Sequence, residues 1–484
     1  MSEHKRLHPI SAVASFVKQL KELIIPFVLI FVLNNNGEKS GFWDYIPILS
    51  IVAVLVFVLV AGIVKWLRFT YRLEDRELRI EYGLFVKKKR YIPFDRIQSL
   101  NFSEGILHRP FGLVKVKVET AGSSNPRESE AELTAIVKEE ALELEKIIYS
   151  EKKGREIPET ETQDTAEKGK ILFNMSPKDI WVLATTSGGI GVILSGVFVF
   201  FSQFNELIPY EAVYEEVAVF IKSGIFIVSI LSFVLLIVAW LLSIAWTFII
   251  YGEFKVKIVD ENIVITRGLL EKKQVTVPLN RVQGIRVVEN PIRQLLGYCT
   301  VQIENAGGSV LDKESTTIKL FPLVKKKRIA DLLDGIFHDY RIVSDFKRLP
   351  KRSLKRYVFR RTIWILIPGT IVTILYFPLG ALSFLSVIPL SVLGYYQYRA
   401  GGWKVDGTQL SLQYRGFLKN TMYMKKNRIQ SLDTKESWFQ SRKNLGSLVT
   451  TVKSGGTGYS SAIHDLERDD IKTVASWFSY NQSI

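Results

Sequence analysis

Three Arg-x-Gln pairs are the residues of this chain whose types and spacing come closest to a binding chemistry. They are Arg96 with Gln98, Arg281 with Gln283, and Arg428 with Gln430. In a β-strand, residues two apart share one face, so each pair would present a guanidinium beside an amide. Such a face could bind a phosphate, a carboxylate or the backbone of a partner. It could equally hydrogen-bond neighbouring loops and fix the mouth of a small barrel, and the sequence leaves both interpretations open.

Clusters of basic residues at predicted hairpins and loops suggest a second kind of binding. They are Lys87, Lys88, Lys89 and Arg90; Lys272 and Lys273; and Lys425 and Lys426. Near an anionic membrane surface each basic residue contributes about 1 kcal/mol of binding, so these side chains are candidates for contact with lipid headgroups. The alternative is an ordinary solvated face. Nucleic acid is not expected as a partner, because the chain lacks the stacking motifs of nucleic-acid binders.

The other reactive side chains form no catalytic or metal site that we would assign. The histidines His4, His8, His108, His338 and His464 have no ligand partner at metal spacing. Cys299, the only cysteine, lies in a predicted strand and is expected to be a core thiol. No phosphate-cradling glycine loop and no Gly-x-Ser-x-Gly motif occurs. We therefore expect a protein that is not an enzyme and has no cofactor.

The elements that would position these residues recur as three copies of one pattern. In each copy a period-2 segment leads to a glycine, then to a basic segment and the Arg-x-Gln element. The glycines Gly83, Gly268 and Gly416 precede the arginine by 13, 13 and 12 residues. This pattern is typical of a β-hairpin whose glycine supplies a positive φ. A second glycine position follows in each copy, at Gly112, Gly297 and Gly446, and opens another strand-like run.

Each copy is expected to begin at a proline and to end in an amphipathic helix. The prolines Pro9, Pro177 and Pro350 each precede a hydrophobic block, which is a helix-start signal. The closing helices are predicted at about 130–149, 325–339 and 465–480. A strand set of this size with one terminal helix makes a small β-barrel or sandwich that is capped at one end.

Six hydrophobic blocks in three pairs predict transmembrane helices. They cover about 16–33 and 46–67, 180–201 and 224–250, and 358–377 and 380–398. The stretches between pairs are strongly basic, so the positive-inside rule places both termini and all three polar regions in the cytoplasm. The second outer loop is acidic, with Glu206, Glu211, Glu215 and Glu216. These residues could sense a cationic peptide, or they could only enforce the topology.

Composition and the repeat together give a segment map. The chain has 484 residues, is 47% hydrophobic and has a formal net charge of +16, which suits a membrane protein held near anionic lipid. The predicted segments are 1–70 (N-terminal segment and helix pair 1), 71–149 (first β-rich domain), 150–174 (flexible linker), 175–251 (helix pair 2), 252–340 (second β-rich domain), 341–398 (basic segment and helix pair 3) and 399–484 (third β-rich domain). The linker assignment rests on its Glu, Thr and Lys content.

The Leu-His-Pro opening at 7–9, the Arg-Ile-Gln-Ser element behind a glycine hairpin and the preceding span pair resemble bacterial pleckstrin-homology-like (bPH2) domain membrane proteins. In particular they resemble the YdbT-type family of Bacillus relatives, over almost the whole chain. The resemblance implies an α+β membrane protein in which each helix pair is followed by a cytoplasmic pleckstrin-homology-like (PH-like) barrel with a C-terminal helix. It also implies a non-enzymatic role in envelope stress or antimicrobial-peptide resistance. The copies depart from the pattern at Gly284, which replaces serine, and before Arg428, where the proline is missing.

Two functions of different classes remain as hypotheses. The first is a multi-pass scaffold in the cell (plasma) membrane. Its partners would be anionic inner-leaflet lipids and a second PH-like membrane protein or a homo-oligomer. The alternative is a transport or flipping protein that removes a membrane-active amphipathic compound. The predicted spans contain no paired charged residues, which argues against ion-coupled transport but not against lipid handling.

Overall fold

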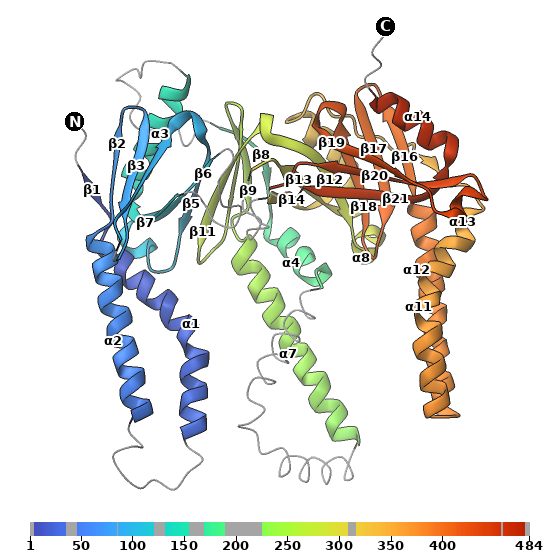
Figure 1. Cartoon of the computed structure of the whole chain (residues 1–484), viewed down its shortest axis with the longest axis horizontal. Helices are drawn as coiled ribbons and strands as arrows, with labels where there is room; N and C mark the ends of the chain where they lie inside the picture. Colours follow the sequence, from blue (N-terminus) through green and yellow to red (C-terminus); the bar gives the residue numbers. More distant parts are fainter. Residues whose placement is uncertain are drawn as a thin grey trace.

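The computed structural model describes residues 4–34, 46–84, 86–120, 131–153, 169–188, 225–307, 316–455 and 458–479. Three β-rich domains lie in a row, and the long helices extend from the row toward one side (Figure 1). Each domain has its own buried apolar core. The fold class is therefore α+β with a repeated unit, as the sequence predicts.

Each domain consists of a four-stranded set, a three-stranded set and a closing helix. Domain 1 contains β1 (Lys5–Arg6), β2 (Thr70–Glu74), β3 (Glu77–Tyr82), β4 (Lys88–Pro93), β5 (Ile97–Glu104), β6 (Leu113–Thr120), β7 (Ala131–Val137) and α3 (Lys138–Lys153). Domain 2 contains β8 (Lys170–Asn174), β9 (Lys255–Val259), β10 (Asn262–Arg267), β11 (Lys272–Pro278), β12 (Val282–Glu289), β13 (Tyr298–Asn305), β14 (Thr317–Lys325) and α10 (Ile329–Asp334). Domain 3 contains β15 (Lys347–Arg348), β16 (Gly402–Asp406), β17 (Gln409–Arg415), β18 (Lys419–Lys425), β19 (Ile429–Lys435), β20 (Leu445–Val452), β21 (Tyr459–Glu467) and α14 (Arg468–Phe478).

The predicted glycine hairpins form in the first two copies. Gly83 and Gly268 have φ values of +132° and +106°, and a Cβ on either would lie 2.0 Å from a carbonyl oxygen of the same turn. Only glycine fits such a position without strain. At Gly416 a Cβ would meet nothing within 4 Å and φ lies outside the positive range, so the third hairpin turns without this requirement.

The second glycine position differs from our expectation in the third copy. Gly112 and Gly297 have φ of 62° and 71°, and their carbonyls accept hydrogen bonds from the first residue after β7 and β14. The residue that does the same in domain 3 is Asn444, with φ of 50°, rather than Gly446. Asparagine is one of the few other residues that tolerates this left-handed backbone, which explains why the glycine pattern concealed it.

The closing helices are shorter than predicted. Residues 131–137, which we expected in the first closing helix, form strand β7 because Ala131, Leu133 and Ala135 alternate into the core. The helix itself starts at Lys138. In the other copies the helices cover only Ile329–Asp334 and Arg468–Phe478 of the predicted ranges.

Each helix pair is inserted between the first and second strands of its domain. β1 pairs with β2, β8 with β9, and β15 with β16, so both ends of a pair are attached to one sheet. Residues 170–174 of the predicted linker therefore belong to domain 2 as β8. The cause is Phe173, which is buried against the rings of Phe254 and Phe321. The described part of the linker before it consists of the end of α3 and Gly169.

Four helices are long and apolar enough to cross a membrane among the residues described: Leu49–Leu67, Phe233–Tyr251, Ser353–Leu375 and Leu379–Ala400. They lie in α2 (Ile46–Leu67), α7 (Ile225–Tyr251), α11 (Ser353–Leu375) and, joined, η6 (Leu379–Ser386) with α12 (Val387–Ala400). The predicted block 16–33 lies in α1 (Ile10–Asn34), whose first half carries Lys18, Lys21 and Glu22. The predicted block 180–201 begins in α4 (Pro177–Thr186), and its remainder lies outside the described residues, as do Glu206, Glu211, Glu215 and Glu216.

Neighbouring domains share their sheets. β5 of domain 1 pairs with β11 of domain 2, which makes one seven-stranded sheet in the order β7-β6-β5-β11-β10-β9-β8. β12 of domain 2 pairs with β18 of domain 3, which makes a second sheet in the order β14-β13-β12-β18-β17-β16-β15. We call these contacts the first and second junctions. The row in Figure 1 is therefore held together by backbone hydrogen bonds as well as by side chains.

Candidate interaction surfaces: hairpins and junctions

The turn of each glycine hairpin contacts the end of a membrane-span helix. The Arg68 guanidinium, just after α2, donates to the carbonyl of Leu84 at 2.7 Å. The amide of Leu269 donates to Ile249 of α7 at 2.9 Å, and the Gln397 amide of α12 donates to Gly416 at 2.8 Å. The hairpins β3–β4, β10–β11 and β17–β18 thus lie where the helices leave the domains.

Basic residues of the first two hairpins lie at this helix-proximal end. Lys87 and Lys89 pair with Glu81 at 2.5 and 3.5 Å, yet their side chains remain 61% and 53% exposed. Lys88 is exposed on the same strand, and Arg90 is partly exposed. Lys272 begins β11, and Lys273 follows with its ammonium 4.0 Å from Glu271. One acidic residue lies near each turn, Glu81 in the first hairpin and Glu271 in the second, so basic residues outnumber acidic ones there.

Lys425 and Lys426 lie elsewhere. They end β18 and begin the following turn, at the end of the strand opposite the hairpin. Lys425 donates to the carbonyl of Asp339, and Lys426 lies over the ring of Trp477 at 5.8 Å. The residue equivalent to Lys87 and Lys272 is Lys419. The alignment of the three repeats missed it because the third hairpin is one residue shorter.

The arginines of the Arg-x-Gln pairs are outside the strands. Arg96, Arg281 and Arg428 each end a 3-10 turn, and the strand begins at the following residue. Gln283 is 7% exposed and donates to the carbonyl of Arg281 at 3.0 Å, a bond that closes the turn. Gln430, by contrast, is exposed. The arginines therefore lie just before the strands rather than within them, and any ligand role of these pairs remains a prediction.

The first junction is short and borders a basic hollow. Lys272, Lys273 and Gln274 of β11 face Glu104, Ser103 and Phe102 of β5. The side-chain oxygen Oδ1 of Asn101 also accepts a hydrogen bond from the backbone amide of Thr276 at 3.3 Å. The strand pairing ends at Gln274 and Phe102.

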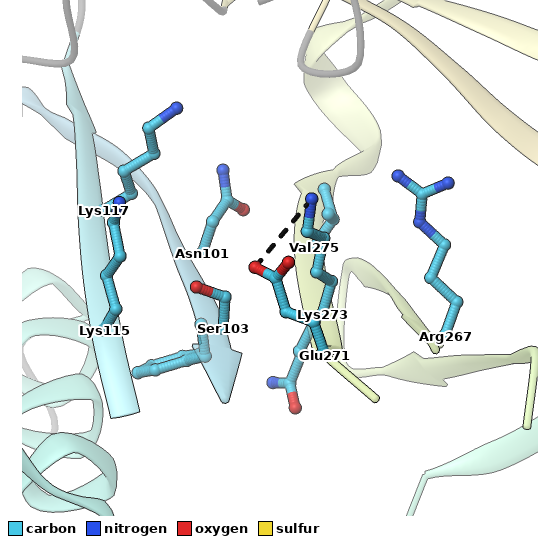
Figure 2. Close-up of a pocket in the computed structure, with 10 residues that line it drawn as sticks. Asn101, Ser103, Lys115, Lys117, Arg267, Glu271, Lys273 and Val275 are labelled. Carbon is cyan, nitrogen blue, oxygen red and sulfur yellow. Dashed lines mark ion pairs between the residues drawn. The ribbon is translucent and has the colours of Figure 1, made fainter. Parts of the chain in front are cut away.

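A hollow of about 150 Å³ lies against the paired residues of the first junction. Figure 2 shows Lys115 and Lys117 of β6 on one wall, and Arg267, Glu271 and Lys273 on the other. The four basic groups outnumber the two acidic groups beside them, Glu271 and Glu132, of which Glu132 pairs with Lys115 at 2.6 Å. The excess of positive charge favours anions such as phosphate. Lys273, one of the predicted headgroup contacts, is therefore part of a wider cluster drawn from two domains.

The second junction is longer and buried. Six residues of β12, Gly284 to Glu289, pair with Met424 to Lys419 of β18. Tyr423 of domain 3 lies in the core of domain 2 and is 3% exposed. Gly284 lies close to the partner strand: a Cβ there would lie 2.4 Å from the terminal methyl group of Met422 and 3.1 Å from the carbonyl oxygen of Tyr423.

A buried charge cluster links domains 2 and 3. Glu304 is fully buried, 3.1 Å from the Arg286 guanidinium, and accepts from Ser454 of domain 3 at 2.8 Å. Arg286 in turn donates to the hydroxyl of Tyr459 at 2.8 Å and stacks over its ring at 4.3 Å. Two charges that are removed from water are stabilised only by well-placed partners, and Glu304 and Arg286 find theirs in both domains. The cluster therefore favours one arrangement of the two domains.

A glutamate that sequence reasoning missed recurs at the end of β5, β12 and just after β19. Glu104, Glu289 and Glu436 each lie eight residues after the arginine of an Arg-x-Gln pair, a spacing that could have identified them. Each pairs with the first residue after the last strand of its domain: Lys138, Lys326 or Arg468. Glu289 also binds Lys419 at 3.3 Å across the second junction.

No group of histidine, cysteine or acidic residues that could hold a metal ion occurs within the described ranges. Cys299 is fully buried in β13, as predicted, and burial raises the pKa of its thiol to about 12. The thiol is therefore protonated and unreactive at neutral pH.

Comparisons with known proteins agree with the threefold repeat. The family model of the bacterial PH domain (bPH_2) matches residues 21–152, 212–336 and 363–482. The UPF0699 transmembrane protein YdbT of Bacillus subtilis (strain 168) is 35% identical over 100% of this chain and 99% of its own length. The UPF0699 transmembrane protein YdbS of the same organism is 27% identical over 22% of this chain and 72% of its own length. No solved structure matches. The chain is therefore a membrane protein that belongs to the bacterial PH domain family and, like the YdbT protein, to the UPF0699 transmembrane proteins.

Proposed function

We propose that this protein is a non-enzymatic integral membrane scaffold whose PH-like domains engage anionic headgroups of the inner leaflet. The observation that carries the proposal is the position of the basic hairpins. Lys87, Lys89 and Lys273 lie on turns that touch the ends of the span helices. A bilayer around those helices brings its headgroups to these side chains.

The basic hollow at the first junction supports the same proposal. It lies beside the β10–β11 hairpin, within reach of the same bilayer surface, and combines lysines of β6 and β11. Basic residues at an anionic surface contribute about 1 kcal/mol each. Several such residues on a tethered domain are enough to fix its orientation against the bilayer.

The proposed topology has six spans in three pairs, with both termini and all three domains in the cytoplasm of a plasma-membrane protein. Support comes from the basic stretches between pairs and from the helices, which leave the row on one side (Figure 1). A cysteine at exposed Ser460 in β21 reports on this topology, because native Cys299 is buried. An impermeant maleimide should label Ser460→Cys only after cells are opened, and labelling of intact cells would reject the cytoplasmic placement.

Lipid engagement is tested with the full chain in nanodiscs. Hydrogen exchange of the β3–β4 and β10–β11 hairpins should slow when phosphatidylcholine is partly replaced by phosphatidylglycerol. The protection should weaken with added salt, because surface charges are screened. Equal exchange in both lipids would overturn the proposal.

Matched variants locate the effect. Lys272→Gln with Lys273→Gln should remove the lipid-dependent protection of its hairpin. Lys425→Gln with Lys426→Gln removes the same charge at the opposite end of a strand and should change nothing. An equal effect of the two double variants would show that only net charge matters.

The biological output that we propose is envelope protection, as in envelope stress or tolerance of antimicrobial peptides. Deletion should raise sensitivity to such peptides, and the Lys272→Gln/Lys273→Gln variant should restore tolerance less well than the wild type. The transport alternative predicts efflux of an amphipathic probe from vesicles that contain the purified chain alone. The scaffold proposal predicts no efflux beyond that of empty vesicles.

A further inference from the structure

The two ends of the row carry complementary strand edges. Within the described residues, β4 of domain 1 pairs only with β3, and β19 of domain 3 pairs only with β20. β4 is the equivalent of β11 and β18, which form the junctions from one side. β19 is the equivalent of β5 and β12, which form them from the other. Each end of the row therefore presents half of a junction.

Both junctions inside the chain use the same register. Glu104 faces Lys272 in the first, and Glu289 faces Lys419 in the second. These are equivalent residues of the repeat, so the pairing rule is a property of the unit. Applied to the free edges, the rule places Glu436 opposite Lys87, Asp433 opposite Arg90 and Leu432 opposite Tyr91.

Burial at the free edges differs from burial at the junctions. Tyr423 and Tyr91 occupy equivalent positions, but Tyr423 is 3% exposed and Tyr91 is 52% exposed. The second junction buries Tyr423 in the core of the preceding domain, whereas no described strand pairs with β4 on the side of Tyr91. Exposed Thr434 of β19 likewise corresponds to Val287, which is 4% exposed.

The charges at the two ends are of opposite sign where the register brings them together. Asp433 and Glu436 lie at the β19 end, and Lys87, Lys88, Lys89 and Arg90 lie at the β4 end. Glu289 already shows how such an acid is shared, because it binds both Lys326 of its own domain and Lys419 of the next. Glu436 has the first of these partners in Arg468. One pair, Lys435 with Lys88, is like-charged and opposes the contact.

We propose that β19 of one chain pairs with β4 of a second copy of this chain, in the register of the internal junctions. Backbone hydrogen bonds along the edge would supply affinity, and the charge pairs would fix the register. The contact is head-to-tail, so repetition gives a ring or an open row rather than a closed dimer. The inference rests on the proposed membrane scaffold only in that both copies share one bilayer and one orientation; it does not require lipid binding.

Cysteine cross-linking in membranes tests the register. Lys89 and Thr434 are opposite each other in the proposed pairing, so Lys89→Cys and Thr434→Cys are made in the full-length chain. Copper phenanthroline should give a ladder of cross-linked species for the double variant. A mixture of the two single variants should give dimers only, and each single variant alone should give monomer. Cys299 is buried and contributes no background.

A matched control uses the other edge of the same sheet. Lys89→Cys with Ser460→Cys places the second thiol on exposed β21 and should not cross-link. Cross-linking of Thr434→Cys alone would indicate a symmetric contact and overturn the proposal. Absence of the ladder would also overturn it. The charged residues on β4 and β19 would then be interpreted as protection of the strand edges against pairing.

Charge exchange tests the Glu436–Lys87 pair. In the cross-linking background, Glu436→Lys or Lys87→Glu should reduce the ladder several-fold, and the two together should restore it. Glu436 is not one of the proposed headgroup contacts, and the β10–β11 hairpin is not part of the proposed contact, so Glu436→Lys should leave the lipid-dependent exchange of the β10–β11 hairpin unchanged. A lost ladder with intact lipid protection therefore separates a failure of this inference from a failure of the proposed function. No restoration in the double variant would reject the pairing register.

Discussion

The two junctions are built from equivalent strands yet differ in extent. The first joins three residues of β11 to β5, and the second joins six residues of β12 to β18. The second also buries Glu304 with Arg286, while the first borders a basic hollow. The same repeat therefore makes both a long, buried contact and a short contact between neighbouring domains. Domains 2 and 3 share the longer strand pairing, and the basic hollow lies at the shorter one.

Removal of the charge at the centre of the second junction should have the largest effect. Arg286→Ala leaves Glu304 buried without its cation, which typically costs about 3–5 kcal/mol. Denaturant unfolding of the purified chain, followed by the exposure of Cys299, measures the loss. Arg267→Ala at the first junction is the control and should change stability by less than about 0.5 kcal/mol. Equal effects of the two variants would show that the junctions do not differ.

Restoring serine at Gly284 should weaken the second junction by a smaller amount. The new side chain would meet the methyl of Met422, which lies 2.4 Å from the Cβ position at the end of a flexible side chain, and the carbonyl oxygen of Tyr423 at 3.1 Å. Such overpacking costs about 1 kcal/mol. The reverse change at the equivalent position of domain 1, Ser99→Gly, removes the hydrogen bond from Ser99 to Glu119 at 3.0 Å within that domain. That loss should be about 1 kcal/mol. Thermal unfolding compares them, and a neutral Gly284→Ser would contradict the close approach.

Asn101→Ala should loosen the first junction alone. Its side-chain oxygen accepts from the backbone amide of Thr276 across the junction at 3.3 Å, and its side-chain nitrogen donates to Glu119 within domain 1 at 3.0 Å. The expected cost is about 1 kcal/mol. Hydrogen exchange at Thr276 should become faster, with no change in β12 or β18. Faster exchange in β18 would mean that the junctions are coupled rather than independent.

Labelling of Cys299 gives the smallest and most local comparison. With a thiol pKa raised to about 12 by burial, the wild type should react with a maleimide only on unfolding. Arg286→Ala should react faster than Gly284→Ser, and Asn101→Ala should match the wild type. Rapid reaction of the wild type at neutral pH would show that domain 2 opens without disturbance of either junction.

Local patterns predicted the local structure well. The hairpins at Gly83 and Gly268 and the burial of Cys299 followed from residue type and period. Asn444 was missed because asparagine can replace glycine in a left-handed turn, and β7 was missed because its alanines also suit a helix. β8 was missed because a five-residue strand after a charged linker carries little signal.

The junctions could not be predicted in the same way. Pairing between β12 and β18 uses backbone groups, which leave no pattern in the sequence, and it joins residues far apart in the chain. Lys419 was hidden by the shorter third hairpin. One sequence signal of the junctions was present, the glutamate eight residues after each Arg-x-Gln arginine. Its role in pairing neighbouring domains is recognised only from the contact between Glu289 and Lys419.

The insertion of each helix pair between two adjacent strands makes the row a mechanical element. Thinning of the bilayer changes the tilt of a helix pair. Both ends of that pair are attached to one sheet, so the sheet must turn with it. Because the sheets are continuous across the junctions, the turn passes to the next domain. A local deformation of the membrane would thereby be carried sideways through the three β-rich domains, over the length of the row.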